Sequence, residues 1–199
     1  MAGIATVKFS ERNLRNLQRQ FKGYESAMPK VMSRAINKTA KAARTKAARE
    51  ISGIIKVKVG RVRKAIGIKK ATYFTWQADV GVDHKSQRIP LIDFAARQTK
   101  KGVSYKIDST GQRKTIPSAF ITTVRTLWNK DAKGHKGVFV RRGTASHPID
   151  QYFGPSIGRV FAGSSAIIAR VTGEASTNLK KNIEVQTDLL LKKLKSRAA

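Results

Sequence analysis

The chain has 199 residues and a mass of 22.0 kDa, the size of one ordinary domain. It carries 41 Lys and Arg against 12 Asp and Glu, a formal charge of +29, and 40% of its residues are hydrophobic. It contains no cysteine, which excludes a disulfide framework, a thiol nucleophile and a cysteine-ligated metal or iron–sulfur cluster. A compact body with so much like charge repels itself. The composition therefore predicts a polyanionic partner: nucleic acid first, an acidic membrane second, an acidic protein third.

The first predicted element is a helix that begins at Ser10 and ends near Gly23. Leu14, Leu17 and Phe21 recur at helical spacing, which places them on one face. The start of the chain has no continuous apolar stretch of the kind that marks a secretory signal, and no apolar run approaches the roughly 18 residues of a membrane span.

The second predicted helix is longer and begins near Pro29, a residue suited to the first turn of a helix. Small and apolar residues recur along one face in a narrow stripe that is rich in alanine, which lets another backbone come close. The stripe comprises Met28, Met32, Ala35, Ile36, Thr39, Ala43, Ala47 and Ile51. A different face carries Lys30, Arg34, Lys38 and Lys41.

Residues 30–70 are the most basic stretch, with 14 Lys and Arg against a single acid, Glu50. Residues 55–59 alternate charged and apolar side chains as in a short strand. Residues 61–64 fit a helical turn instead, and the sequence leaves both interpretations open. We predict that this stretch is a basic helix and arm that faces a polyanion and binds phosphate groups without reading sequence. The candidate contact residues are Arg34, Lys38, Lys41, Arg44, Lys56, Lys58, Arg61, Arg63 and Lys64.

A β-rich body is predicted over residues 71–161. Residues 72–82 alternate most cleanly, which favours a strand with Phe74 and Trp76 in the core. Bases of single-stranded nucleic acid can stack on such rings when they are exposed, which is the alternative interpretation. Further strands are predicted over 103–107, 119–127 and 138–141, with 129–137 as an exposed hairpin tip. Trp128 and Phe139, near this tip, are candidate interface contacts.

The last predicted element is a helix over residues 172–197. Its apolar side holds Leu179, Ile183, Leu190 and Leu194. The order of two basic N-terminal helices, antiparallel strands and a C-terminal helix predicts an α+β fold.

Motifs that carry catalysis or bind metal are almost absent from the sequence. Residues 154–158 match G-x-S-x-G, but no histidine follows His147, so the Ser–Asp–His order of that motif is incomplete and a turn is expected. The histidines lack metal-ligand spacing, and the acids are scattered among many cations, with Asp79 and Asp83 the nearest candidate pair. We therefore expect no enzyme activity, no metal and no cofactor.

Six segments in sequence order carry a family resemblance: SRAINKTAKAARTKAAREI (33–51), VKVGRVRKAIGIKKAT (57–72), RIPLIDFAARQTKKGVSYKI (88–107), RKTIPSAFITTV (113–124), KGVFVRRG (136–143) and HPIDQYFGPSIGRVF (147–161). In this order the chain resembles the phage minor tail protein Z family, the tail-completion proteins of long-tailed phages. The resemblance implies one tail-completion-like domain over 1–199, comprising the basic helix and arm, the β-rich body and the C-terminal helix.

The resemblance also implies a function. Such a protein is made in the host cytoplasm and forms a ring, hexameric by tail symmetry, at the head-proximal end of the virion tail. There it completes the tail for head–tail joining beside the tail terminator, tail tube or head–tail connector, without catalytic residues and without a membrane. The basic residues above would line or rim the lumen and contact DNA in the tail channel, or face acidic ring partners. Two alternatives stay open: a tail terminator or neck connector, and a free nonspecific nucleic-acid-binding protein.

Overall fold

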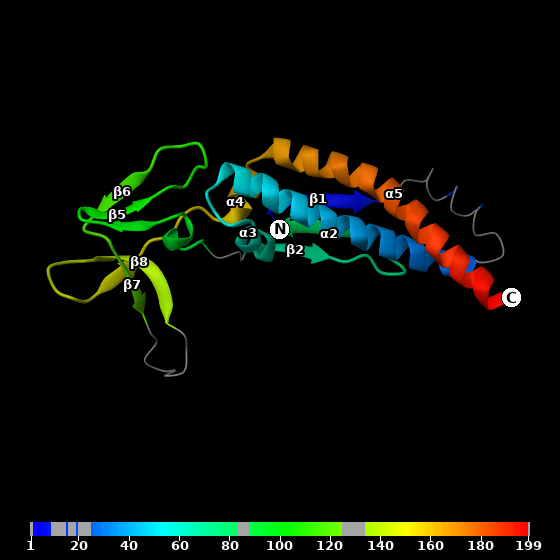
Figure 1. Cartoon of the computed structure of the whole chain (residues 1–199), viewed down its shortest axis with the longest axis horizontal. Helices are drawn as coiled ribbons and strands as arrows, with labels where there is room; N and C mark the ends of the chain where they lie inside the picture. Colours follow the sequence, from blue (N-terminus) through cyan, green and yellow to red (C-terminus); the bar gives the residue numbers. More distant parts are fainter. Residues whose placement is uncertain are drawn as a thin grey trace.

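Two long helices and three small antiparallel sheets make up the fold of the computed structural model (Figure 1). The structure describes residues 2–8, 15, 19, 25–82, 88–124 and 134–198. Apart from positions 15 and 19, the helix expected between Ser10 and Gly23 lies outside these residues. The elements are β1 (Ala2–Lys8), η1 (Glu25–Ala27), α2 (Met28–Ile54), α3 (Val59–Ala65), β2 (Ile66–Lys69), β3 (Gln77–Val82), η2 (Leu91–Asp93), β4 (Arg97–Thr99), β5 (Gly102–Tyr105), β6 (Lys114–Pro117), β7 (Phe120–Val124), β8 (His135–Arg141), β9 (Ile149–Gln151), α4 (Ile157–Ala162) and α5 (Ser165–Ala198).

Helix α2 follows its sequence pattern closely. Pro29 occupies the first turn, and the predicted stripe is buried along its length except for Met28, which is partly buried. Small residues such as Ala40 and Ala47 have no exposed surface, so they allow the close approach of the neighbouring elements that the sequence predicted. Most basic side chains of this helix lie on the side turned to solvent, whereas Arg44 is half-buried and Lys46 contacts α5.

Helix α5 packs along α2 in the antiparallel direction. The Nδ2 atom of Asn182 donates to Oγ1 of the buried Thr39, near the N-terminal half of α2. Toward the other end of α2, Nζ of Lys46 lies 3.0 Å from Oε2 of Glu174 and 3.4 Å from Oε1 of Glu50, which also pairs with Arg170. The hydrogen bond and charge of Glu174, joined by those of Glu50, raise the pKa of the Lys46 ammonium. These polar contacts fix the register of the two helices.

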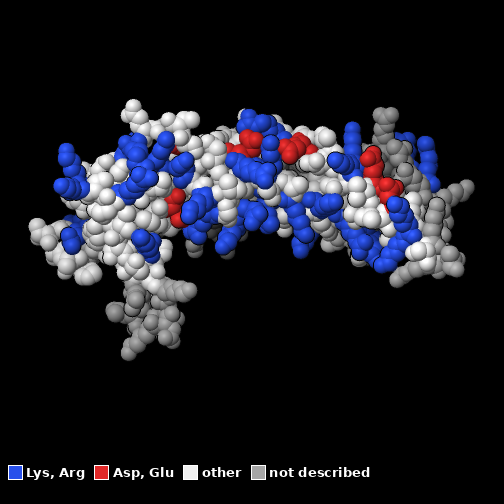
Figure 2. Space-filling model, in the orientation of Figure 1, with Lys and Arg blue, Asp and Glu red and all other residues white. Residues whose placement is uncertain are grey.

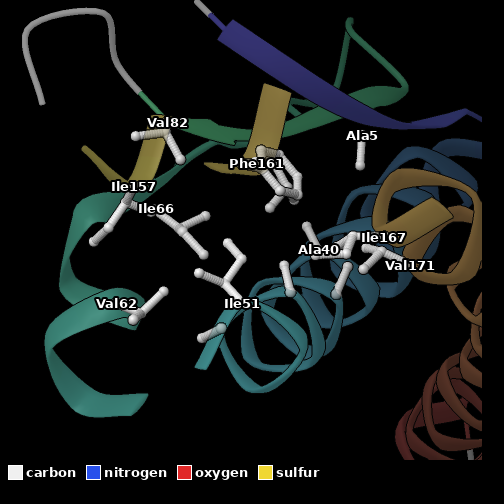
Figure 3. Packing of buried hydrophobic residues seen from close by; sticks show 14 of the residues in the cluster. Ala5, Ala40, Ile51, Val62, Ile66, Val82, Ile157, Phe161, Ile167 and Val171 are labelled. Atoms are coloured by element: carbon white, nitrogen blue, oxygen red, sulfur yellow. The ribbon is translucent and has the colours of Figure 1, made fainter. Parts of the chain in front are cut away.

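The first sheet has the strand order β1-β3-β2, with both pairs antiparallel. Its buried residues pack against the long helices and the short helices α3 and α4 in one continuous core. Figure 3 shows side chains from seven elements pointing into this interior, including Ala5, Ala40, Ile51, Val62, Ile66, Val82, Ile157, Phe161, Ile167 and Val171.

The other two sheets lie at one end of the elongated molecule, and the C-terminus of α5 lies at the other (Figure 1). Their strand orders are β4-β5-β6 and β7-β8-β9, and all pairs are antiparallel. Gln98 joins them, because its Oε1 accepts from the Ile121 backbone N–H while its Nε2 donates to the carbonyl of Ala119. The antiparallel pairing expected of the chain is confirmed, but it is divided among three sheets.

Several boundaries differ from the sequence prediction. Strand β8 begins at His135, inside the expected hairpin tip 129–137, whose residues 129–133 lie outside the described part, and β5 ends at Tyr105 rather than at residue 107. Residues 55–64 were compatible with a strand or a helical turn. The structure has helix α3 from Val59, and Ile55 forms only an isolated bridge with Asp108. Helix α5 begins seven residues earlier than the predicted 172, because buried Ile167 and Val171 extend its apolar side and a Cβ on Gly173 would meet nothing. Strand β3 begins at Gln77 rather than at residue 72.

Candidate nucleic-acid interface

Four basic residues form a row along the solvent side of α2: Lys30, Arg34, Lys38 and Lys41, all exposed. Steps of three and four residues keep side chains on one side of a helix with 3.6 residues per turn. Among the described residues no carboxylate forms a salt bridge with any of the four. We call this row the α2 stripe, and its charge is therefore available to an external anion.

Arg44 differs from the rest of the candidate set. Its side chain is half-buried, and its Nε is enclosed without a hydrogen-bond partner among the described residues. Burying a hydrogen-bond donor without an acceptor lowers the stability of the fold by about 1–3 kcal/mol. Arg44 is thus less exposed to solvent than Arg34, Lys38 and Lys41, although all four belong to the same basic stretch.

The remaining candidates lie where α2 ends and α3 packs against it. Lys56, Lys58, Arg61, Arg63 and Lys64 are all exposed. The first three line an open cavity of about 540 Å³ together with Ser52, Val57, Val59, Ile92, Asp93 and Ala95. Ser52 lies 11 residues, about three turns, beyond Lys41 on the same side of α2. Ala48 lies between them on that side and has no exposed surface, so the α2 stripe is interrupted before the cavity and the basic residues around α3 form a second exposed group.

One of these residues already has an acidic partner. Nε of Arg61 lies 3.3 Å from Oδ2 of Asp93, and both side chains are at least one-third exposed. An exposed pair of this kind is weak, so an external polyanion can compete for Arg61. Seven of the nine candidates are exposed and form no salt bridge with a described residue. Figure 2 shows Lys and Arg over much of the visible surface and Asp and Glu at only a few places.

The β2–β3 hairpin adds to the side of the α2 stripe. The side chain of Asn37, next to Lys38 on α2, makes two hydrogen bonds with the backbone of Ala71, each 2.9 Å long. Its Nδ2 donates to the Ala71 carbonyl, and its Oδ1 accepts from the Ala71 N–H. Lys69 and Lys70, which directly precede this anchor, are exposed.

The prediction that Phe74 lies in the core is wrong. Its side chain is 96% exposed, whereas Trp76 is partly buried against the core as expected. The reason is that residues 72–75 form a turn instead of continuing β3: Oγ1 of Thr72 accepts from the N–H groups of Phe74 and Thr75. An exposed phenylalanine does not contribute the roughly 1.5–3 kcal/mol of stability that its burial would give.

The second aromatic expectation is also corrected. Phe139 is buried, and its ring centroid lies 6.4 Å from that of Phe120, so it belongs to the packing of β7 and β8 and not to an open surface. Trp128 lies outside the described residues.

The G-x-S-x-G match, His135 and Asp79 make local contacts within the fold. Ser156 of the G-x-S-x-G match caps α4 by accepting from the Arg159 N–H, so residues 157 and 158 begin a helix instead of completing the expected turn. His135 is 2.6 Å from the Gln151 amide, and Asp79 accepts from Thr6 and Gln77. His84 and Asp83 lie outside the described residues. Within the part of the chain that the structure describes, no three His, Asp or Glu side chains are grouped so as to hold a metal ion.

A second open cavity, of about 600 Å³, lies near α4. Arg88 and Arg159 line it together with the partly exposed rings of Tyr152 and Phe153. None of these residues was singled out from the sequence as a contact, because they are drawn from two separate stretches with no unusual charge density.

Comparison with known proteins decides the family. The sequence model described as Prophage minor tail protein Z (GPZ) matches residues 7–193. The chain belongs to this family. The resemblance drawn from six segments is confirmed and extends over nearly the whole chain. No curated protein and no solved structure matches the chain significantly.

Membership supports a structural role in a phage tail rather than an enzymatic one, and with it a place in the virion and contacts with other virion proteins. Among the described residues, none of the helices has both the length and the apolar character needed to cross a lipid bilayer.

Proposed function

We propose that this minor tail protein forms a ring at the head-proximal end of the tail, completes the tail for joining to the head, and faces DNA in the channel with its basic side. The observation that supports the DNA contact is the α2 stripe together with the exposed cations around α3, most of which have no acidic partner within the described chain. Exposed cations without acidic partners can bind the phosphate groups of DNA, and such contacts do not depend on the base sequence.

Charge repulsion between the copies of a ring favours an anion at its centre. Each copy carries +29, so copies gathered in a ring repel one another unless an anion lies between them. Helix α2 has 27 residues and is about 40 Å long. A duplex of that length carries about 24 phosphate charges, because double-stranded DNA has one charge per roughly 1.7 Å. Eight of the nine candidates are exposed, so this number of phosphates matches the exposed candidate cations of about three copies, half of a six-membered ring.

The DNA contact is tested with neutral substitutions in the α2 stripe. The variant Arg34→Gln, Lys38→Gln, Lys41→Gln should bind duplex DNA more weakly than wild type, and the slope of log K against log salt should fall by about 2–3. Arg44 is left unchanged because it is half-buried, so the fold should be retained. Fluorescence anisotropy across a salt series measures both quantities.

A matched control removes the same charge elsewhere. Lys180, Lys181 and Lys192 are exposed on α5, and their replacement by Gln should change duplex affinity much less. An equal loss in the two triple variants would show that only net charge matters, and unchanged binding by the α2 variant would refute the DNA contact.

The place in the particle is tested separately by an image reconstruction of the virion. Density for a ring of this chain where the tail meets the head is the expected result. Density at the distal tip of the tail would contradict the proposal. A tail terminator or neck connector would occupy an adjacent layer, which the same reconstruction separates from tail completion.

A further inference from the structure

The tip of the β2–β3 hairpin presents two aromatic rings to solvent beside the basic side of the molecule. Phe74 is 96% exposed and Tyr73 is 55% exposed. Among the described residues, Phe74 forms no ring–ring and no cation–π pair. Its exposure therefore leaves both faces of the ring available to a flat ligand.

Hydrogen bonds within and below the tip hold it in one conformation. Thr72 Oγ1 accepts from the N–H groups of Phe74 and Thr75, at 3.3 Å and 3.0 Å, and Trp76 Nε1 donates to the carbonyl of Tyr73 at 3.0 Å. The paired hydrogen bonds of Asn37 fix the start of the turn to α2. The rings are thus presented by an ordered turn, so little conformational entropy is lost when something binds to them.

The surroundings of the tip are positive. Lys69 and Lys70 lie on its N-terminal side, and its anchor Asn37 directly precedes Lys38 in the α2 stripe. No described carboxylate forms a salt bridge with any of these lysines. A ligand that is anionic as well as flat suits these surroundings, in which Asp79 opposite Lys69 is a described acid of the same hairpin.

We propose that the tip formed by Tyr73 and Phe74 binds single-stranded DNA, with bases stacked on the rings and the sugar–phosphate backbone beside Lys69 and Lys70. The inference rests on the proposed DNA contact of the basic side. It assigns different roles to two parts of that side: the α2 stripe binds the phosphates of duplex or single-stranded DNA, whereas the tip binds only unpaired bases. In a duplex the faces of the bases are stacked on one another, so only an unpaired strand offers them to the rings. Aromatic rings in a basic groove are the usual means of binding single strands without sequence preference.

The test compares a labelled oligothymidylate with a duplex of the same length, measured by fluorescence anisotropy. Phe74→Ala should weaken binding of the single strand about 5- to 150-fold, the range expected from the loss of one stacked base, and leave duplex affinity unchanged. The salt dependence should stay the same, because no charge is removed. Phe74→Trp should retain single-strand affinity, since the larger ring also stacks.

The matched control is Phe153→Ala, which removes another partly exposed phenylalanine, beside β9. It should leave single-strand affinity unchanged. Because Phe74 is almost fully exposed, its replacement is not expected to disturb folding, and equal melting temperatures of Phe74→Ala and wild type would verify this.

Each other outcome overturns the inference in a distinguishable way. If wild type binds neither form of DNA, the DNA contact of the proposed function fails and this inference with it. If the α2 variant loses duplex binding but Phe74→Ala binds the single strand normally, only the inference fails. If Phe74→Ala binds single strands normally yet is missing from assembled tails, the tip docks on a protein instead.

Discussion

At the scale of single residues, Gly154 shows how closely the segment before α4 packs against the interior. A Cβ added at Gly154 would lie 2.3 Å from Cε2 of Phe94, a ring with no exposed surface. The backbone cannot move away easily, because the Gly154 N–H donates to the carbonyl of Ile89. We expect Gly154→Ala to lower the free energy of unfolding by about 1–3 kcal/mol, as overpacked cores do.

The control for this prediction is Gly143→Ala, since a Cβ at Gly143 would meet nothing within 4 Å. Urea denaturation of both variants measures the difference. Equal stabilities would mean that Phe94 moves aside without loss.

A second residue-scale prediction concerns pH. Arg142 donates two hydrogen bonds to Asp150, 2.7 Å and 2.8 Å long, and these lower the pKa of the carboxyl below its ordinary value of 3.8. A depressed pKa stabilises the fold above the ordinary pKa, and this contribution is lost as pH falls through the folded-state value. The stability difference between wild type and Asp150→Asn should therefore be constant near neutral pH and shrink below about pH 4.

Both partners of this pair are exposed, so the difference should be small. Chemical denaturation of the two proteins between pH 7 and strong acid measures it. A difference that grows as the medium becomes more acidic would contradict the assignment.

Residue-scale features also mark the limit of what the sequence predicts. The candidate cations could be chosen from charge density alone, but nothing local distinguishes half-buried Arg44 or acid-paired Arg61 from the others. Phe74 was placed in the core because its alternation continues that of a true strand. The anchor that turns it outward joins Asn37 to Ala71, 34 residues apart, and such a contact leaves no periodic pattern.

At the scale of elements, the small residues of α2 set its distance from its neighbours. Ala40 has no exposed surface, and Figure 3 shows it close to Ile167 and Val171 of α5. A larger side chain at this position would push α2 away from α5 or force neighbouring side chains into unfavourable rotamers. Ala40→Leu should therefore destabilise the protein by about 1–3 kcal/mol.

Ala42→Leu serves as the control, because Ala42 is exposed on the same helix and the change in helix propensity is the same. Thermal unfolding of the two variants measures the effect. Similar melting temperatures would show that α5 shifts freely over α2.

Elements with long, regular patterns were predicted well, and those made by distant pairing were not. Helix α2 and the middle of α5 repeat apolar residues over many turns, which defines a face locally. Strand β1 was missed because its seven residues pair with β3, whose Asp79 stands opposite Thr6 at a separation of 73 residues. The division into three sheets was missed for the same reason: it depends on contacts such as those of Gln98.

At the scale of the whole molecule, the charge of +29 predicts opposite salt dependences for two kinds of binding. Raising salt from about 0.1 M to 1 M shortens the Debye length from about 10 Å to 3 Å, which weakens repulsion between copies. Association between copies should therefore strengthen with salt, whereas DNA binding should weaken.

Sedimentation velocity and fluorescence anisotropy over one salt series test this prediction together. If association between copies instead weakened with salt, ion pairs between copies would be the dominant force in their contact. The sequence alone gives this prediction, since it depends on net charge and on no detail of the fold.

The antiparallel packing of α2 and α5 has one more consequence. Glu50 and Glu174 form ion pairs with Lys46 at the contact between the two helices, and Glu184 and Asp188 lie farther along α5, whereas no described carboxylate forms a salt bridge with the α2 stripe. Helix α2 thus has a net charge of +6 and α5 one of +4, so the positive charge is only slightly biased toward α2. If the proposed DNA contact holds, this bias would favour the approach of a subunit to DNA with α2 leading.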